Sequence, residues 1–159
     1  MEIRPFSPAD AAKTAAMVAA TLRISNGADY SPEYIEEAIR THSAPDLIRL
    51  SQEGHFYVAR DGDRIVGCGG IVGYWGSLTE SILLTVFVLP KLHGKGIGRT
   101  IMRTLEADAY YRRASRIEIP ASIKATEFYR KFGYDFKNGI KELDEEGHYR
   151  LEKFREVKP

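Results

Sequence analysis

The residues from Ile82 to Leu89 constrain the fold more than any other segment. They read Ile-Leu-Leu-Thr-Val-Phe-Val-Leu, so apolar side chains fall on both faces of an extended chain. A strand with this pattern lies in the middle of a sheet whose two faces are both covered. Pro90 follows directly and ends the strand, because proline has no backbone N–H to donate. The segment therefore predicts a central strand between two covering layers.

Weaker signals on either side of this strand predict further strands and helices. Alternating or apolar runs favour strands, whereas apolar positions at helical spacing and capping residues favour helices. The expected strands are 3–6, 55–60, 65–74, 116–119, 134–137 and 148–154; the expected helices follow Ser7 or Asp10, begin at Ser31-Pro32, and span 97–111 and 121–132. This order predicts an α+β sheet with one strand–helix–strand crossover. No linker is apparent, so we expect a single domain over residues 1–159.

Charge and cysteine content exclude several classes of function. The formal net charge of +1 lacks the strong positive field that most nucleic-acid binders carry, so no nucleic-acid partner is expected. Cys68 is the only cysteine, and the four histidines have no metal-ligand spacing, so no disulfide and no metal site are expected. We see no signal peptide and no apolar run of transmembrane length. The expected location is the cytoplasm, without a membrane partner.

Three alternating glycines, Gly94, Gly96 and Gly98, lie between the central strand and an amphipathic helix. Alternating glycines let successive backbone amides turn inward and form a concave anion site, and the start of a helix adds its positive dipole end. Lys95 and Arg99 supply cations beside them. The pattern indicates a phosphate or pyrophosphate site; the alternative is a tight strand-to-helix turn without a ligand. The spacing fits neither a Walker loop nor a dinucleotide-binding loop.

Two motifs in this order resemble those of the GNAT acetyltransferases. The run from Val88 to Gly98 resembles the acetyl-CoA loop of that family, with His93 where glutamine or arginine is usual. The run from Ser122 to Tyr134 resembles the second family motif, with Ser122 in place of asparagine and Tyr134 in place of phenylalanine. The resemblance covers about residues 65–136. It implies a mixed, mostly antiparallel central sheet of six to seven strands, flanked by about four helices and splayed at the middle strands.

The resemblance implies acetyl-CoA as the acyl donor. The pantetheine arm is then expected along the strand before the loop, added to its edge as a peptide adds to a sheet. The cofactor-binding residues expected on this basis are Val86, Phe87, Val88, His93, Gly94, Lys95, Gly96, Ile97, Gly98, Arg99, Thr100 and Ser122.

Two residues are candidates for acid–base chemistry. Glu80, just before the central strand, is the candidate base that deprotonates the amine, and a solvated carboxylate at the strand end is the alternative. Tyr129 stands at the family's acid position and is expected to assist the leaving thiolate; the alternative is a packing role beside Phe128 and Phe132.

The acceptor end is less specified. The resemblance implies that the N-terminal helices wall the acceptor site, which makes Asp29, Tyr30, Tyr34 and Trp75 the candidate substrate-binding residues. The expected function is transfer of an acetyl group to a primary amine, on a small molecule or on a protein or peptide, by a monomer or homodimer. The alternative is a CoA-binding regulatory module without turnover.

Overall fold

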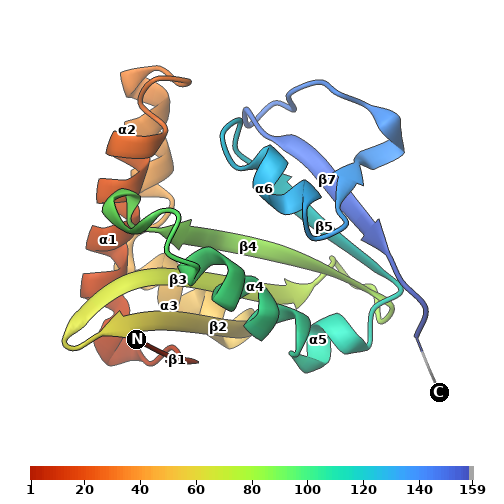
Figure 1. Cartoon of the computed structure of the whole chain (residues 1–159), viewed down its shortest axis with the longest axis horizontal. Helices are drawn as coiled ribbons and strands as arrows, with labels where there is room; N and C mark the ends of the chain where they lie inside the picture. The colour runs from red at the N-terminus through yellow and green to blue at the C-terminus, as the bar shows by residue number, and fades with distance from the viewer. Residues whose placement is uncertain (158–159) are drawn as a thin grey trace.

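The computed structural model describes residues 1–157 and contains one seven-stranded sheet with the order β1-β2-β3-β4-β5-β7-β6 (Figure 1). The strands are β1 (Glu2–Pro5), β2 (Gly54–Asp61), β3 (Arg64–Gly73), β4 (Glu80–Val88), β5 (Arg116–Ala121), β6 (Asp135–Phe136) and β7 (Tyr149–Phe154). Neighbouring strands are antiparallel except β4 and β5, which are parallel. The predicted mixed, mostly antiparallel sheet is therefore confirmed.

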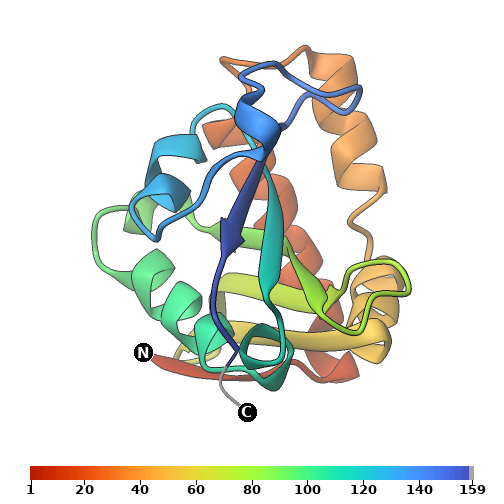
Figure 2. The same cartoon turned by 90° about the vertical axis from the view of Figure 1, so that its right-hand side faces the viewer.

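Helices cover both faces of this sheet, as the turned view shows (Figure 2). They are α1 (Ala11–Ser25), α2 (Pro32–Arg40), α3 (Ala44–Glu53), α4 (Ile97–Glu106), α5 (Ala109–Arg112) and α6 (Thr126–Arg130), with short 3-10 turns at Pro8–Asp10, Pro90–Leu92 and Lys137–Gly139. One apolar cluster packs α1 to α3 on one face, which we call the α1–α3 face. The other packs α4 to α6 on the opposite face, the α4–α6 face.

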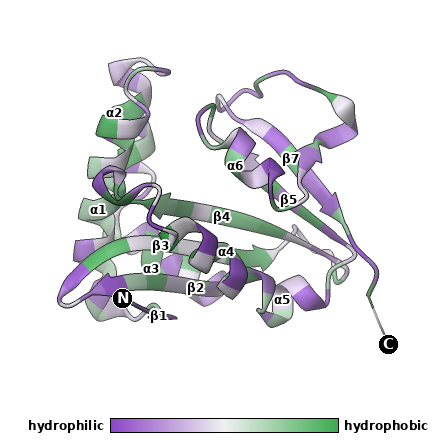
Figure 3. Cartoon of the chain, viewed as in Figure 1, coloured by the Kyte–Doolittle hydropathy of each residue, from purple (hydrophilic) through white to green (hydrophobic). Residues whose placement is uncertain are grey.

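The central position predicted for β4 is confirmed. Ile82 packs into the cluster of the α1–α3 face and Leu83 into that of the α4–α6 face, and both side chains are buried. The apolar colouring of β4 between the two helical layers is visible in Figure 3. The glycines of β3 permit close packing beside it, because a Cβ at Gly69 would lie 2.8 Å from a methyl group of Ile101 on α4.

A β-bulge at Thr85 makes β4 diverge from β5. Cys68 of β3 pairs with Phe87 and Gly70 pairs with Leu84, so β4 has one extra residue between these pairs. Thr85 takes a positive φ of 58°, and its carbonyl accepts a hydrogen bond from the Cys68 thiol at 3.2 Å. A bulge bends its strand and increases the local twist. β4 pairs with β5 only over Glu80–Ile82, and beyond that the two strands splay apart (Figure 1).

The helix expected over 97–111 is broken, and Asp108 explains the break. The Asp108 carboxylate accepts hydrogen bonds from the Tyr110 amide at 2.8 Å and from the Tyr57 hydroxyl of β2 at 2.6 Å. It therefore begins a separate helix, α5, at a position fixed by contact with the sheet.

Two further helix predictions need correction. The expected helix 121–132 shrinks to α6, because Ala121 completes β5 and the turn at 122–125 follows it. The prediction missed α3 altogether, although Ser43 and Asp46 form a capping box around Pro45 at its start.

Candidate active site

A cavity of about 860 Å³ opens where β4 and β5 have separated. Its lining comes from the end of β4, the glycine loop, the start of α4, α6 with the turn before it, and the end of α1. Of the expected cofactor-binding residues, ten line it: Val86, Phe87, Val88, His93, Gly94, Gly96, Ile97, Gly98, Arg99 and Ser122. Lys95 does not line the cavity, and neither does Thr100, whose hydroxyl donates to the Gly96 carbonyl at 2.9 Å.

The glycine loop presents a group of free backbone amides. Gly94 and Gly96 have φ values of 81° and 84°, which turn the chain between the strand and the helix. Among residues 1–157, no carbonyl or side chain accepts from the amides of Gly94 and Gly96 or from the first three amides of α4, 97–99. Five amides beside a helix N-terminus form a site for an anion.

Two packing contacts hold this loop in place. The His93 imidazole donates from Nε2 to the Val88 carbonyl at 2.8 Å, so it links the loop to the end of β4. A Cβ at Gly98 would lie 3.0 Å from the Phe128 ring, so a larger residue would push α4 away from α6. His93 thus has a structural contact that the sequence prediction did not foresee.

Four cationic side chains border the cavity. Arg99 was expected, whereas Arg103, Lys124 and Lys131 were not singled out from the sequence. Arg103 lies one turn after Arg99 on α4, so the i, i+4 spacing could have indicated it. Lys124 and Lys131 come from the other wall, and only the fold brings them to the same space. Together these charges suit a ligand with several phosphate groups.

Tyr129 lies on α6 with its side chain 5% exposed, and it lines the cavity. Among residues 1–157, no hydrogen-bond partner of its hydroxyl is found, and burial rather than hydrogen bonding dominates the environment of this group. Burial raises the pKa of the Tyr129 hydroxyl, so the group keeps its proton at neutral pH. The site therefore contains a protonated donor that is free to bind a ligand atom.

The structure does not bring Glu80 to this cavity. Glu80 is at the start of β4, six residues before Val86, which is about 20 Å along an extended strand. Its carboxylate accepts from Arg116 at 2.9 Å, and together they line a separate, open hollow. This geometry argues against the predicted role as base. We expect Glu80→Gln to leave kcat and its pH profile unchanged in an acetyl-transfer assay, and a drop in kcat that recovers at high pH would restore Glu80 to the mechanism.

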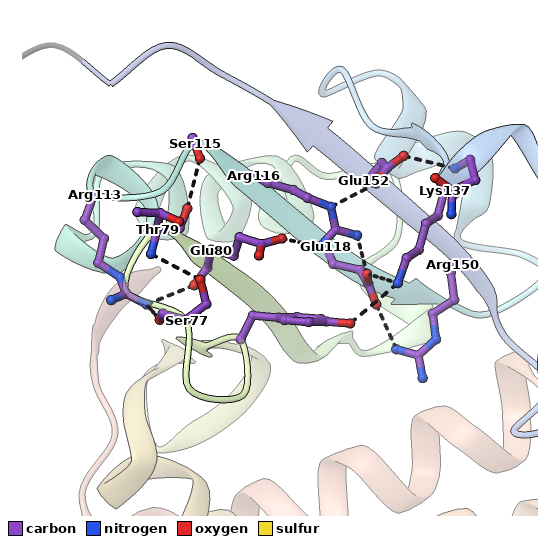
Figure 4. Close-up of polar contacts among 12 residues, drawn as sticks. Ser77, Thr79, Glu80, Arg113, Ser115, Arg116, Glu118, Lys137, Arg150 and Glu152 are labelled. Carbon is purple, nitrogen blue, oxygen red and sulfur yellow. Dashed lines mark hydrogen bonds and ion pairs between the residues drawn. The ribbon is translucent and has the colours of Figure 1, made fainter.

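Glu80 belongs instead to a charged network on the α1–α3 face of β5 and β7 (Figure 4). Arg116 also bonds Glu118 and Glu152, and it lies over the ring of Tyr74. Glu118 is 1% exposed and pairs in addition with Lys137 at 2.8 Å and Arg150 at 3.2 Å. These cations lower the pKa of the Glu118 carboxyl despite its burial.

Replacing Glu118 with glutamine should lower the free energy of unfolding by about 2–3 kcal/mol, because the change leaves buried cations without their partner. This loss of stability is smaller than that expected for a fully buried ion pair, since the Lys137 and Arg150 side chains are each about one third exposed. A carboxyl with a lowered folded-state pKa stabilises the protein above its unfolded pKa and loses this effect as the pH falls through the folded value. The difference in the free energy of unfolding between parent and variant, measured by urea unfolding, should therefore become smaller below about pH 4. A constant difference down to pH 2 would contradict this account.

Tyr30 and Tyr34 clasp the loop between β6 and β7. Their rings stack at 4.3 Å, and their hydroxyls donate to the carbonyls of Gly147 at 2.6 Å and Glu146 at 2.5 Å. The Tyr30 hydroxyl also accepts from the Ile123 amide at 3.2 Å, in the turn beside the cavity. Both hydroxyls are therefore engaged with backbone groups, and the pair joins three loops.

The other two predicted acceptor residues form none of the hydrogen bonds of this clasp. Asp29 is exposed in the α1–α2 loop. Trp75 is 72% exposed in the β3–β4 loop, where its ring meets Tyr74 edge on. That loop precedes Glu80 and lies toward the paired end of β4 and β5. The structure therefore brings Asp29, Tyr30 and Tyr34 into one region and places Trp75 in a separate loop.

Two further properties concern the described residues. In the stretch 1–157, no three His, Cys, Asp or Glu side chains are grouped so that they could hold a metal ion. Within the same stretch, no helix has the length and apolar character needed to cross a membrane.

Comparison with known proteins identifies the family. The model of the acetyltransferase (GNAT) domain matches residues 52–135, more than half of the chain. The PaiA N-acetyltransferase of Thermoplasma acidophilum, solved in complex with coenzyme A, is 21% identical and superposes with a TM-score of 0.80 over 97% of this chain and 98% of that one. A GCN5-related N-acetyltransferase from Rhodopseudomonas palustris is 26% identical, with a TM-score of 0.78 over 97% and 95%. No curated protein matches the sequence. The chain belongs to the GNAT family, and it is an acetyltransferase that uses acetyl-CoA as its donor.

Proposed function

We propose that this protein, acting as one domain over residues 1–159, transfers the acetyl group of acetyl-CoA to a primary amine by direct attack in a ternary complex. The observation that carries the proposal is the position of the cavity. It joins a cluster of free amides and cations at one end to the unpaired edge of β4 and the Tyr129 hydroxyl at the other. A nucleotide with a long acylated arm needs both ends, whereas a simple anion needs only the first.

The donor would lie with its pyrophosphate on the amides of the glycine loop. Arg99, Arg103, Lys124 and Lys131 would neutralise its phosphates. The pantetheine amides would add to the edge of β4 at Val86–Val88, which pairs with no strand on the β5 side. This arrangement would bring the thioester to the Val86 end of the segment, next to the bulge at Thr85 where β4 and β5 diverge, beside Tyr129.

The reaction needs no protein nucleophile. The nitrogen lone pair attacks the thioester carbonyl, a C–N bond forms, and a backbone amide of β4 would stabilise the developing oxyanion. The C–S bond then breaks, and the thiolate receives the proton that the nitrogen releases, with the Tyr129 hydroxyl as its hydrogen-bond donor. Cys68 takes no part, because it is fully buried and burial raises the pKa of its thiol.

The experiment that tests this function measures thiol release from acetyl-CoA with a panel of amines. The panel contains small polyamines, amino acid amides, lysine peptides and arylamines. We expect at least one amine to give stoichiometric thiol and acetylamide, with acetyl-CoA raising the melting temperature by mass action. Tight CoA binding without turnover on any amine would instead support the regulatory-module alternative.

A further inference from the structure

The imidazole of His148 is partly buried but takes part in none of the hydrogen bonds that stabilise the fold. It directly precedes β7, and its ring forms no hydrogen bond with any of residues 1–157. Nδ1 is enclosed by protein and has no partner, which leaves Nε2 as the nitrogen open to solvent. Buried polar atoms are nearly always paired, so an unpaired one calls for an explanation such as a catalytic role.

The position of His148 follows from the register of β7. Tyr149 pairs with Ala121, the last residue of β5, and Ser122 next to it lines the donor cavity. Ala121 is three residues beyond Glu118, the last residue of β5 that pairs with β4, so His148 lies about level with the bulge at Thr85, where the thioester is expected. This position contrasts with that of Glu80, which is at the paired end of the same two strands.

His148 lies on the face of the sheet opposite Tyr129. Side chains alternate along a strand, so His148 shares a face with Arg150, which reaches Glu118 on the α1–α3 face. Leu151 points the other way, into the cluster that contains Tyr129. An amine that approached from the α1–α3 face would meet His148 first, while the leaving sulfur would face Tyr129.

A second histidine, His42, lies near His148 on the α1–α3 face, close enough for its charge to act on the His148 ring. The His42 ring, in the turn between α2 and α3, meets the Phe87 ring of β4 edge on at 5.7 Å. Phe87 also lines the donor cavity. His42 and Thr85 line a hollow of about 180 Å³ on this face, together with Glu53 and the ion pair of Asp46 and Arg49. His148 does not line this hollow itself, but the charge of His42 acts on the His148 ring, so the two histidines lie near one another on the α1–α3 face.

The backbone around His148 is held firmly. The clasp formed by Tyr30 and Tyr34 bonds the carbonyls of the two preceding residues, 146 and 147. The His148 amide donates to the Asp144 carboxylate at 2.9 Å, and Arg150 donates to the same carboxylate at 2.7 Å. Asp144 is therefore committed to the loop, and the imidazole remains free in a fixed position.

The charge state of the ring suits a base. The groups that act on it are Asp144 and Glu146 in its own loop, Arg150 on β7 and His42 on the opposite wall. Burial outweighs the two carboxylates and lowers the pKa of His148 below its ordinary value of about 6.5. The imidazole is therefore neutral at pH 7.

We propose that His148 is the general base of the reaction, a role that rests on the proposed function and that replaces Glu80. Nε2 takes a proton from the amine nitrogen as the C–N bond forms, because the nitrogen becomes more acidic when it gives its lone pair to the carbonyl. The C–S bond breaks, and the Tyr129 hydroxyl donates a hydrogen bond to the thiolate but keeps its own proton. His148 releases to solvent the proton it took from nitrogen, and the thiolate takes one from solvent, so the proton lost by the amine and the proton gained by sulfur balance over the cycle.

The test compares His148→Asn with the parent and with His55→Gln. His55 lies on β2 and bonds Asp108, outside the proposed site. We expect His148→Asn to lower kcat/KM about 10- to 100-fold at pH 7. The kcat/KM of this variant should recover as the pH rises toward the pKa of the amine, because the amine then loses its proton without help. The affinity for CoA should be unchanged. His148→Ala should regain activity with added imidazole. His55→Gln should match the parent in rate and profile.

Two results would overturn the assignment. One is a parental rate and pH profile in His148→Asn. The other is a pH–rate profile in which the rise in kcat/KM with deprotonation of the base is lost in His42→Gln but kept in the His148 variants.

An NMR titration separates this inference from the proposed function. In the CoA complex, the His148 imidazole signal should titrate below pH 6.5 and shift when a panel amine is added. A shift without any turnover in the parent would keep His148 in the amine site and reject acetyl transfer to these amines. Absence of the shift would reject His148 as the base.

Discussion

Replacing Gly96 with aspartate should raise the dissociation constant of CoA by a factor of about 100 or more. Gly96 has a φ of 84°, so an aspartate there would make the free loop relax to another conformation, and CoA binding would have to restore the strained one at a cost of about 1–2 kcal/mol. The new carboxylate would also lie beside the amides that are proposed to bind the pyrophosphate, where repulsion at about 4 Å adds about 1–4 kcal/mol. Even about 3 kcal/mol in total corresponds to roughly 100-fold in affinity. Calorimetric titration with CoA measures this directly.

Two matched variants separate charge from backbone strain. Gly96→Ala introduces the strain without the charge, so its affinity should fall between those of the parent and Gly96→Asp. Gly62→Asp places the same residue at a φ of 60° in the β2–β3 turn, where a Cβ would meet nothing within 4 Å. It should lose stability but bind CoA as the parent does. If Gly96→Asp keeps parental affinity, the glycine loop does not bind the pyrophosphate.

Replacing Tyr129 with phenylalanine should lower kcat about 10²–10³-fold while the fold and CoA affinity are retained. The hydroxyl is the free donor at the thioester end of the cavity, and phenylalanine keeps the ring that packs against Phe128. Because burial raises the pKa of Tyr129, full proton transfer to a thiolate whose conjugate thiol has a pKa of about 8.5 is unfavourable. The expected contribution is therefore a hydrogen bond that strengthens as negative charge develops on sulfur.

Tyr134→Phe is the matched control for this measurement. The Tyr134 hydroxyl is buried without a partner and does not line the cavity. Removing an unpaired buried hydroxyl is neutral or stabilising, so this variant should keep the parental kcat and the same or a higher melting temperature. Equal rates for Tyr129→Phe and the parent, at saturating acetyl-CoA, would return Tyr129 to a packing role.

The sequence predicted local features of the fold best. The apolar run that became β4 predicted a central strand, because a strand with two apolar faces is stable between two layers. Ile82 and Leu83 at its start are buried, whereas residues 84–89 are half-buried because β4 and β5 separate there. The glycines and the helix signal after Pro90 predicted an anion site, because positive φ values and free helix-start amides follow from residue type and order. The second motif identified Tyr129 by its place in the resemblance to the family.

Other features were decided only by contacts between distant segments. Asp108 ended the helix predicted over 97–111 because it meets Tyr57, which is 51 residues away in sequence. Glu80 left the candidate site because Arg116 pairs with it at the closed end of the splay. Tyr30 and Tyr34 bind the loop before β7 through its backbone carbonyls, a contact between segments more than 100 residues apart. The same loop carries His148. Composition and spacing carry no record of such pairings, since the distance between two side chains across a sheet depends on register and on the Thr85 bulge. The sequence by itself determined the central strand and the glycine loop, whereas the tertiary structure alone decided which titratable side chains lie near the cavity, because their positions depend on contacts between distant segments.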